Sequence, residues 1–164
     1  MATHLVIRQA QTEDVLRMRE IAAKAWAPIY DDYRKRMGEA LYQLKMPGDR
    51  LALKADEVSS FFEQYPEWCL VTELDGIVAG FITFVLHRDK SIGEIGNNAV
   101  DPDCQGHGVG TTQCQRVLEI FRQAGMQYAR VDTGLDPAHA PARAMYEKAG
   151  LKPMIPYVEY YVKL

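Results

Sequence analysis

The chain has 164 residues, a length typical of one domain with a hydrophobic core of its own. Apolar residues make up 48% and charged residues 25%, which matches folded globular proteins and excludes a disordered or fibrous class. The net charge of −3 gives no positive field for nucleic acid or anionic lipid, so we expect neither partner. No apolar stretch reaches membrane-spanning length and the first residues carry no signal-peptide core, so a cytoplasmic location is expected.

The first 65 residues predict one strand followed by helices. Residues 5–9 (LVIRQ) are rich in strand-forming side chains. Thr12, followed by two acids, is an N-cap signal for a helix that should run to about Trp26 and be interrupted at Pro28. The segment 29–65 is mostly helical in character, and we expect two or three short helices there.

The second half of the chain predicts a β-hairpin and then further strands and helices. Asp75-Gly76 lies between apolar strands over 68–74 and 77–85, and this dipeptide favours the positive φ angles of a tight hairpin turn. The other predicted elements are a strand over 92–100, a helix ending near 124, a strand over 128–131, a helix over 138–149 and a strand over 157–163. This order predicts an α+β fold in a single domain spanning 1–164.

Three alternating glycines, Gly106, Gly108 and Gly110, precede the helix that ends near residue 124. Without Cβ atoms they allow successive backbone N–H groups to turn toward one point. The first turn of the helix adds unpaired N–H groups and the positive end of its dipole. Such a loop suits a phosphate or pyrophosphate, although a simple tight turn explains three glycines equally well.

Two common phosphate-binding motifs do not fit this loop. A dinucleotide fingerprint requires Gly or Ala three residues after its second glycine, where the two possible registers have Thr111 and Gln113. A Walker loop requires Gly-Lys followed by Ser or Thr, but Gly110 is followed directly by Thr111. The spacing therefore excludes a Rossmann dinucleotide site and a kinase or ATPase loop.

The loop and its flanking motifs resemble the GNAT superfamily of acyl-CoA N-acyltransferases. Gln105-Gly106-His107-Gly108-Val109-Gly110 matches the superfamily signature Gln/Arg-x-x-Gly-x-Gly/Ala, and the runs 98–102 and 142–151 are also typical of it. The resemblance implies a GNAT-like fold, with a mixed and mostly antiparallel sheet flanked by helices, and an N-acetyltransferase that uses acetyl-CoA. The residues that it assigns to the cofactor are Asn98, Ala99, Val100, Gln105, Gly106, His107, Gly108, Val109, Gly110, Thr111, His139 and Tyr146.

One position departs from the superfamily pattern. The helix before the family tyrosine often opens with Asn seven positions earlier, where this chain has His139. The imidazole ring can also donate a hydrogen bond, so it could contact the pantetheine arm of the cofactor. A solvent-facing histidine is equally consistent with the sequence.

Two side chains are candidates for proton transfer. The resemblance places Tyr146 at the position of the proton donor to the leaving thiolate, and a core tyrosine is the alternative. It places Glu94 near the acetyl end of the cofactor-binding strand, as a base that acts directly or through a water; a solvated strand-end glutamate is the alternative. Side-chain alternation predicts that Glu94, Asn98 and Val100 share one face, unless a β-bulge at Gly96 reverses the assignment.

The sequence does not name the acetyl acceptor. Related proteins place an acceptor-binding wall where this chain has Trp26, Tyr30 and Tyr33, although aromatic residues at this spacing also suit a core. We expect a small-molecule or peptide amine as acceptor, with homodimerisation possible. A catalytically silent acyl-CoA-binding or sensor domain is the alternative function, because it too would keep the glycine loop.

The cysteines and histidines show no metal-ligand spacing, so we expect no metal. Cys69, Cys104 and Cys114 are expected to be reduced thiols rather than a disulfide framework. Cys104 flanks the glycine loop, where it is either a reactive thiol or simply a small residue in a tight loop.

Overall fold

A five-stranded sheet forms the centre of the molecule. The computed structural model describes residues 4–164, and the strands lie in the order β1-β2-β3-β4-β5. They are β1 (Leu5–Gln9), β2 (Cys69–Leu74), β3 (Ile77–His87), β4 (Ile92–Val100) and β5 (Tyr128–Val131). Strands β1 to β4 pair antiparallel and β5 runs parallel to β4. The predicted α+β fold with a mixed, mostly antiparallel sheet is confirmed.

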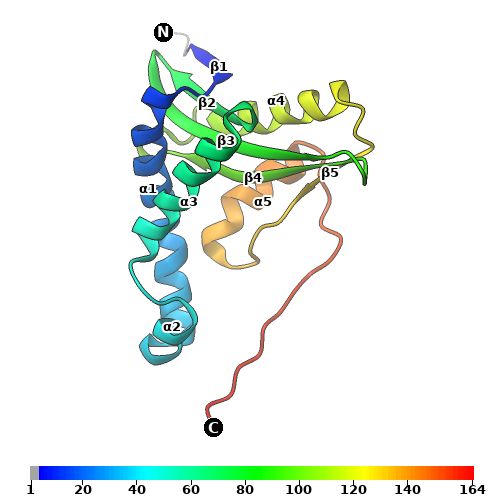
Figure 1. Cartoon of the computed structure of the whole chain (residues 1–164). Coiled ribbons are helices and arrows are strands. Elements are labelled where there is room, and N and C mark those ends of the chain that lie inside the picture. The colour runs from blue at the N-terminus through cyan, green and yellow to red at the C-terminus, as the bar shows by residue number, and fades with distance from the viewer. Residues whose placement is uncertain (1–3) are drawn as a thin grey trace.

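Helices cover both faces of the sheet (Figure 1). They are α1 (Val15–Met37), α2 (Glu39–Lys45), α3 (Arg50–Gln64), α4 (Val109–Gln123) and α5 (Ala140–Lys148). The first of these packs with α3 on one face, while α4 and α5 pack on the other. Within residues 4–164, no helix is both long and apolar enough to cross a lipid bilayer.

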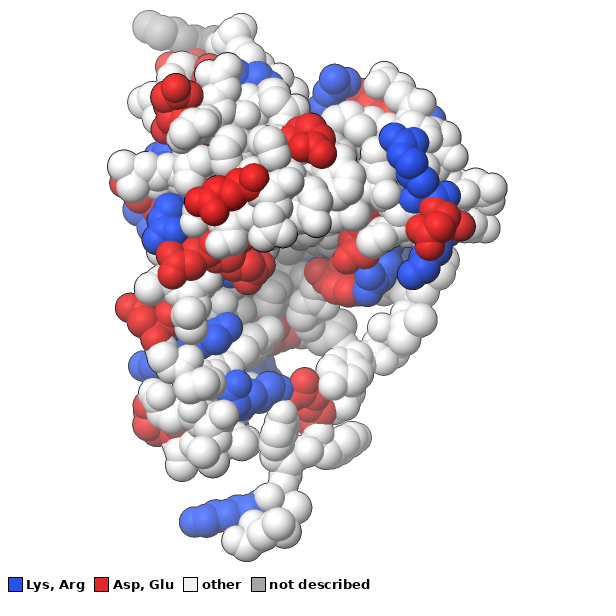
Figure 2. Space-filling model, in the orientation of Figure 1, with Lys and Arg blue, Asp and Glu red and all other residues white. Residues whose placement is uncertain are grey.

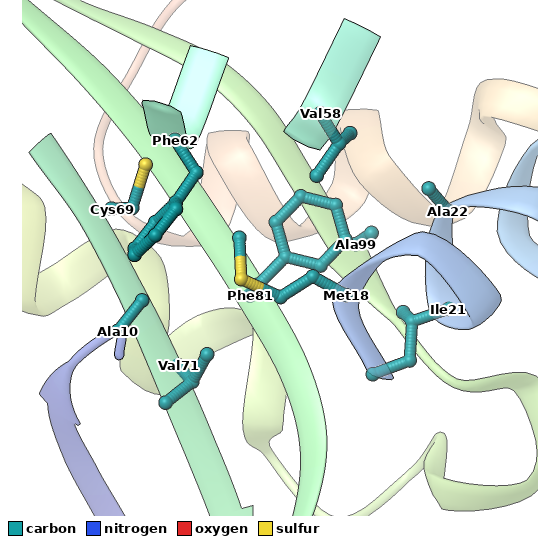
Figure 3. Close-up of a cluster of buried hydrophobic side chains, with 10 residues drawn as sticks. All are labelled: Ala10, Met18, Ile21, Ala22, Val58, Phe62, Cys69, Val71, Phe81 and Ala99. Atoms are coloured by element: carbon teal, nitrogen blue, oxygen red, sulfur yellow. The ribbon is translucent and has the colours of Figure 1, made fainter. Parts of the chain in front are cut away.

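Two buried apolar clusters, one on each face, hold the helices to the sheet. The cluster on the α1–α3 face includes Met18, Val58 and Phe81, all fully buried (Figure 3). The cluster on the α4–α5 face includes Ile82 and Phe121. The neighbours Phe81 and Ile82 belong to opposite clusters, so β3 is buried on both of its faces. Its sequence is therefore an almost continuous apolar run. Each such side chain contributes about 1.5–3 kcal/mol by leaving water.

Helix α1 is longer than the sequence predicts. It passes through Pro28 and ends at Met37, whereas we expected it to end near Trp26. A proline inside a helix removes one backbone hydrogen bond and costs about 3 kcal/mol, so the sequence predicted that the helix ends before Pro28. Packing of α1 against α3 and against the 3-10 turn Pro137–His139 is non-local and offsets this cost.

The start of this helical segment also differs from the prediction. Thr12 lies inside a short 3-10 turn, and the backbone N–H of Gln11 donates to Asp14 Oδ2 at 2.8 Å. The N-cap of this turn is Gln11 and not Thr12, and the Asp14 carboxylate that accepts the Gln11 N–H also binds the Arg8 guanidinium.

The β2–β3 hairpin turns at Asp75-Gly76, as predicted. Both residues have positive φ, 51° for Asp75 and 84° for Gly76, which is the geometry of a type I′ turn. The backbone N–H of His4 donates to Asp75 Oδ1 at 2.9 Å, so the turn also holds the neighbouring edge strand β1.

A β-bulge interrupts the pairing of β3 with β4. The register shift places both Gly96 and Asn97 opposite Thr83. The Thr83 hydroxyl accepts a hydrogen bond from the backbone N–H of Asn97 at 2.8 Å. A Cβ on Gly96 would lie 2.6 Å from the same oxygen, so the bulge requires glycine at this position.

The bulge reverses the faces of β4. Before it, Ile95 belongs to the cluster on the α4–α5 face, so the neighbouring Glu94 points to the α1–α3 face. After it, Ala99 belongs to the α1–α3 cluster, and Asn98 contacts Met145 of α5. The common face predicted for Glu94 and Asn98 is therefore wrong, because the bulge inserts one extra residue between them.

The last predicted strand does not form. After a turn at residues 149–150, residues 151–164 leave α5 as an extended segment without helix or strand, and end far from the sheet (Figure 1). A strand is stable only when its backbone pairs with a neighbour, and a groove separates the segment from β5. The apolar alternation over 157–163 is real, but no strand among the described residues 4–164 pairs with it.

Candidate active site

The glycine-rich loop joins β4 to α4 and exposes its backbone. Gly106 and Gly108 have φ angles of 82° and 81°, and Gly108 is the N-cap of α4. A Cβ on either glycine would meet no atom closer than 4.0 Å, so the positive φ, rather than crowding, requires glycine there. Among residues 4–164 no side chain caps α4, and the N–H groups of its first turn can therefore bind an anion.

A buried aspartate anchors the approach to this loop. Asp101 is 1% exposed and accepts hydrogen bonds from Arg17 at 2.6 Å, from Lys24 at 3.2 Å and from the backbone N–H of Asp103 at 3.0 Å. Burial alone would raise the pKa of Asp101, but these donors outweigh it and hold that pKa below its usual range. The end of β4 is thus tied to α1 by charge.

Strands β4 and β5 diverge beside the loop. They pair only over Ile92–Ile95 and Tyr128–Val131, after which β4 continues to Val100 without β5. Over 97–100, no strand within residues 4–164 pairs with this edge of β4. An extended ligand could therefore lie along β4, with an anionic group at the start of α4.

Tyr146 of α5 lies on the α4–α5 face of this opening. It is 7% exposed and packs in the apolar cluster on the α4–α5 face, next to Met145, which Asn98 of β4 contacts at 3.6 Å. Burial raises the pKa of Tyr146 to about 12 with a further contribution from Cys114, while the nearby Asn98 side chain acts in the opposite direction. The phenol is therefore protonated at neutral pH and can donate a hydrogen bond.

Glu94 lies on the other face of the sheet, where β4 and β5 are still paired. Its carboxylate accepts a hydrogen bond from Arg130 at 2.9 Å and lies 3.0 Å from His87 Nε2. The side chain is 32% exposed, so Glu94 is neither a free surface residue nor a sequestered one. Water can reach the Glu94 carboxylate on the α1–α3 face of the sheet.

His139 is held in place by Asp136 at the start of α5. Asp136 Oδ2 lies 2.6 Å from His139 Nδ1, and Asp136 Oδ1 accepts the His139 backbone N–H at 3.2 Å. Burial would raise the pKa of Asp136, but the hydrogen bond and charge of His139 outweigh it and lower that pKa. At 17% exposure the His139 side chain does not face solvent freely, and only its Nε2 remains for a ligand.

The three aromatic residues of α1 lie toward α3 and α5. Trp26 packs against the α1–α3 cluster, and Lys54 Nζ sits 4.4 Å from its ring centroid. Arg50 lies over the Tyr30 ring at 5.7 Å, and the Tyr33 ring lies 6.4 Å from that of His139. Burial is the main cause that raises the pKa of both tyrosines. The core interpretation therefore holds for Trp26, while an acceptor-binding role of Trp26, Tyr30 and Tyr33 stays a prediction.

A polar group beside this wall was missed by the sequence reasoning. Glu57 Oε1 accepts from Lys54 Nζ at 2.8 Å and from Asn97 Nδ2 at 3.4 Å, which links α3 to the β4 bulge. Lys54 is 9% exposed, unusual for a lysine. The only signal in the sequence was the Lys-x-x-Glu spacing on a helix, which is typical of surface pairs.

The cysteines divide into two kinds. Cys69 and Cys114 are buried, and burial raises the pKa of their thiols to about 12 and about 11 respectively. Cys104 is partly exposed beside the loop. No group of three or more His, Cys, Asp or Glu side chains that could hold a metal gathers within residues 4–164.

Comparison with known proteins decides what this arrangement is. Residues 21–151, more than half of the chain, match the model of the acetyltransferase (GNAT) family. The chain belongs to the GNAT family of acetyltransferases. A mycothiol acetyltransferase from Beutenbergia cavernae is 30% identical over 108 residues, which are 66% of this chain but 35% of that protein. The chain therefore spans about a third of the length of this curated relative.

Solved GNAT structures share the fold. The PaiA N-acetyltransferase of Thermoplasma acidophilum, in complex with coenzyme A, matches with a TM-score of 0.69 and 18% identity over 91% of this chain and 90% of that one. A GNAT family acetyltransferase of Brucella melitensis, in complex with acetyl-CoA, matches with a TM-score of 0.60 and 21% identity over 92% and 84%. Both were solved with coenzyme A or its acetyl thioester bound.

The residues of this GNAT chain fit such a cofactor. The glycine loop offers free N–H groups to a pyrophosphate, and the unpaired edge of β4 offers backbone donors and acceptors to an extended amide-bearing arm. Helix α5, which carries Tyr146, lies beside that edge, because Asn98 of β4 contacts Met145 at 3.6 Å, and His139 is the N-cap of this helix. The resemblance stated on the loop motif is confirmed, while the roles of Glu94, Tyr146 and the individual cofactor-binding residues stay predictions.

Proposed function

We propose that this chain transfers the acetyl group of acetyl-CoA to a primary amine by direct attack of the amine nitrogen on the thioester carbonyl carbon. The observation that carries the proposal is the opening between β4 and β5, which has Tyr146 on one face and Glu94 with the aromatic wall on the other. An amine can approach from the α1–α3 face while sulfur leaves on the α4–α5 face. Backbone N–H groups near Ala99 and Val100 would polarise the carbonyl.

Tyr146 is proposed to stabilise the leaving sulfur. A phenol of pKa about 12 donates a hydrogen bond readily, but full proton transfer to a thiolate of pKa about 8.5 would be uphill by about 5 kcal/mol. We therefore assign Tyr146 a hydrogen bond to the developing thiolate rather than complete protonation. A hydrogen bond to a charged group contributes about 1.5–3 kcal/mol, so its loss should lower kcat roughly 10- to 100-fold.

Glu94 is proposed to accept the amine proton through a water. A lysine-like amine of pKa about 10.4 is neutral in only about one molecule in 2,500 at pH 7, so the site must remove a proton before or during attack. Glu94 lies on the face that the amine approaches, and Arg130 and His87 fix its carboxylate. The acceptor nitrogen loses two protons in all, one from the ammonium before attack and one as the amide forms. The nitrogen–carbon bond forms, the carbon–sulfur bond breaks, coenzyme A leaves as the thiolate, and the two protons pass one after the other by way of Glu94 to solvent.

The test is thiol release from acetyl-CoA in the presence of polyamines, amino acids, aminoglycosides or peptides. Tyr146→Phe should lower kcat without weakening acetyl-CoA binding measured by calorimetry. Tyr128→Phe is the matched control, because Tyr128 is 71% exposed on β5 and its hydroxyl has no assigned role. Full activity of Tyr146→Phe would refute the role of the phenol.

The second candidate function is a silent acyl-CoA-binding sensor, which the open glycine loop alone would satisfy. It predicts binding of acetyl-CoA with no thiol release for any acceptor. In that case Tyr146→Phe and Glu94→Gln would both leave the affinity for acetyl-CoA unchanged, with no turnover to lose.

A further inference from the structure

A pair of amide side chains lies in the apolar layer between the sheet and α4. Of the buried residues of α4, Gln113 alone is polar, and it is fully buried. Gln113 Nε2 donates to Asn98 Oδ1 at 2.6 Å and to the Phe81 carbonyl oxygen at 3.0 Å. Asn98 belongs to the part of β4 that β5 does not pair with, so this amide pair connects the interior with the opening between β4 and β5.

Packing alone does not explain a glutamine at this position. Gln113 Oε1 is buried and has no hydrogen-bond partner among residues 4–164. A Cβ at position 80 would lie 2.3 Å from the same oxygen, so Gly80 of β3 leaves the space that the amide occupies. An unpaired buried oxygen destabilises a fold, and a leucine of similar size would avoid it. A buried group that breaks this rule indicates a functional role.

Gln113 fixes the direction in which the Asn98 amide points. Because the Asn98 oxygen accepts from Gln113 Nε2, the Asn98 NH2 group is turned away from Gln113 and toward α5, where it donates to Met145 Sδ at 3.6 Å. The reverse orientation would bring the two NH2 groups together, and both of them are donors only. The amide pair therefore presents a hydrogen-bond donor, rather than an acceptor, to the opening.

The acceptor that this donor meets is a weak one. A thioether sulfur such as that of Met145 accepts hydrogen bonds poorly. A Cβ on Gly110 would lie 3.6 Å from the same sulfur, so Asn98 and the glycine-rich loop both border Met145. The next residue of α5 is Tyr146, whose phenol has the Asn98 side chain nearby. The Asn98 NH2 group thus lies beside the path from the loop to the phenol.

We propose that Asn98 Nδ2 donates a hydrogen bond to the sulfur of coenzyme A as it leaves, and that Gln113 is the positioning residue that keeps this donor turned toward the sulfur. The inference rests on the proposed function. When the carbon–sulfur bond breaks, its electron pair stays on sulfur and forms a thiolate. Asn98 and Tyr146 then each donate a hydrogen bond to the thiolate, and neither transfers a proton. A donor that is aligned in advance stabilises the developing charge without reorganisation.

The side of the sheet on which sulfur leaves carries no buried cation. Figure 2 shows Lys and Arg side chains on the outside of the molecule. Among residues 4–164, Lys54 is the one buried Lys or Arg, and it pairs with Glu57 on the α1–α3 side. A thiolate that forms on the α4–α5 face is therefore stabilised by neutral dipoles. A dipole is effective only when it is held in the right direction, which gives Gln113 its role.

The first test reads the pKa of the coenzyme A thiol in its complex with the full-length protein. Thiolate absorbance is followed over pH as a difference from the protein without coenzyme A. Asn98→Leu removes the donor and should raise this pKa by about one to two units. Gln113→Leu should raise it by about one unit, because the released Asn98 amide can turn its NH2 group inward to the Phe81 carbonyl oxygen. Gln115→Leu, on the exposed side of α4, is the matched control and should leave the pKa unchanged.

The second test uses the kinetics of any acceptor that the wild type acetylates. Gln113→Leu should lower kcat about 10-fold and change KM for acetyl-CoA less than about 2-fold, because the charge on sulfur develops only in the transition state. Asn98→Leu should lower kcat at least as much. Gln115→Leu should match the wild type.

A double variant separates positioning from stability. Each single leucine leaves a polar partner buried and unpaired, so each should lower the melting temperature. Asn98→Leu combined with Gln113→Leu replaces both partners by apolar side chains and should recover most of that loss. Its kcat should stay as low as that of Asn98→Leu. A kcat that recovers together with the melting temperature would show a purely structural role and overturn the proposal.

Failure of this inference differs from failure of the proposed function. A wild type that releases no thiol with any acceptor, but whose bound thiol responds to both variants as expected, keeps the donor pair and loses the transfer reaction. A wild type that acetylates, with full kcat or an unchanged thiol pKa in Asn98→Leu, overturns the donor pair alone. A protein that binds no coenzyme A overturns both.

Discussion

Replacing Asp101 by asparagine tests the anchor of the glycine-rich loop. The amide keeps the shape of the side chain and can still accept the Asp103 backbone N–H, but it loses the charge that binds Arg17 and Lys24. We expect the variant to be less stable than wild type and to bind acetyl-CoA more weakly, because the end of β4 is then no longer held to α1.

The magnitude follows from the burial of the pair. Removing one partner of a buried ion pair costs about 3–5 kcal/mol when the other is left without water. In Asp101→Asn the charge that loses its partner is that of Arg17, whose side chain is 28% exposed and can be hydrated, whereas Asp101 is 1% exposed. The free-energy cost of the substitution is therefore lower than this range and close to that of one charge-assisted hydrogen bond. We expect about 2 kcal/mol in the free energy of unfolding, which is roughly a 30-fold change in the folded to unfolded ratio.

Urea unfolding followed over pH gives the assay. The pKa of Asp101 is lowered in the folded state, so its contribution is fully present above about pH 4, the unfolded pKa, and is lost as the pH falls through the folded pKa. Wild type and Asp101→Asn should therefore differ most at neutral pH and converge in acid. Asp103→Asn, at an 85% exposed carboxylate, is the control and should change stability by less than about 0.5 kcal/mol. A neutral-pH difference as small as that of the control would refute the anchoring role.

Three further predictions concern the strand, the loop and the helix beside the opening. Gly96→Ala should destabilise the fold and lower kcat/KM, since its Cβ would lie 2.6 Å from the Thr83 hydroxyl; adding Thr83→Ala should recover part of the stability in a double-mutant cycle. Gly108→Ala should weaken acetyl-CoA binding and lower the free energy of unfolding by about 1–2 kcal/mol, because Gly108 has a φ of 81°. Gly110→Ala is the comparison and should have a small effect, because its Cβ would meet other atoms only at 3.4 and 3.6 Å. Melting temperatures measured with and without acetyl-CoA compare the two variants. Tyr146, with a pKa of about 12, should add no ionisation to the pH–rate profile below about pH 11, so an inflection that vanishes in Tyr146→Phe would contradict its burial.

Local rules predicted most of the fold. The strands over 5–9, 92–100 and 128–131 form with the predicted bounds, because their residue types and the turns beside them favour extended chain without distant help. Asp75-Gly76 forms its turn for the same reason. The glycine loop could also be predicted, because neighbouring residues of the same short segment determine both the positive φ angles of its glycines and the start of the helix that follows.

The remaining features depend on contacts between distant residues. Helix α1 continues past Pro28 because α3 packs against it, and nothing near Pro28 in the sequence shows this. The Glu94–Arg130 pair joins strands 36 residues apart, so Glu94 could be proposed as a base but not seen as an ion-pair partner. The strand over 157–163 has the right pattern and no partner, since pairing depends on which edge is within reach.

The bulge at Gly96 has a consequence for how this chain can change. The bulge shifts the alternation of side chains along β4 by one residue. The side chains that would meet the amine therefore lie beside the cluster on the α1–α3 face, and those that would meet the leaving sulfur lie beside the cluster on the α4–α5 face. Substitutions in clusters without shared contacts have nearly additive effects on stability. If the proposed sites are right, residues of α1 and α3 can therefore be exchanged to select a new amine without disturbing the loop and α5 that would bind acetyl-CoA.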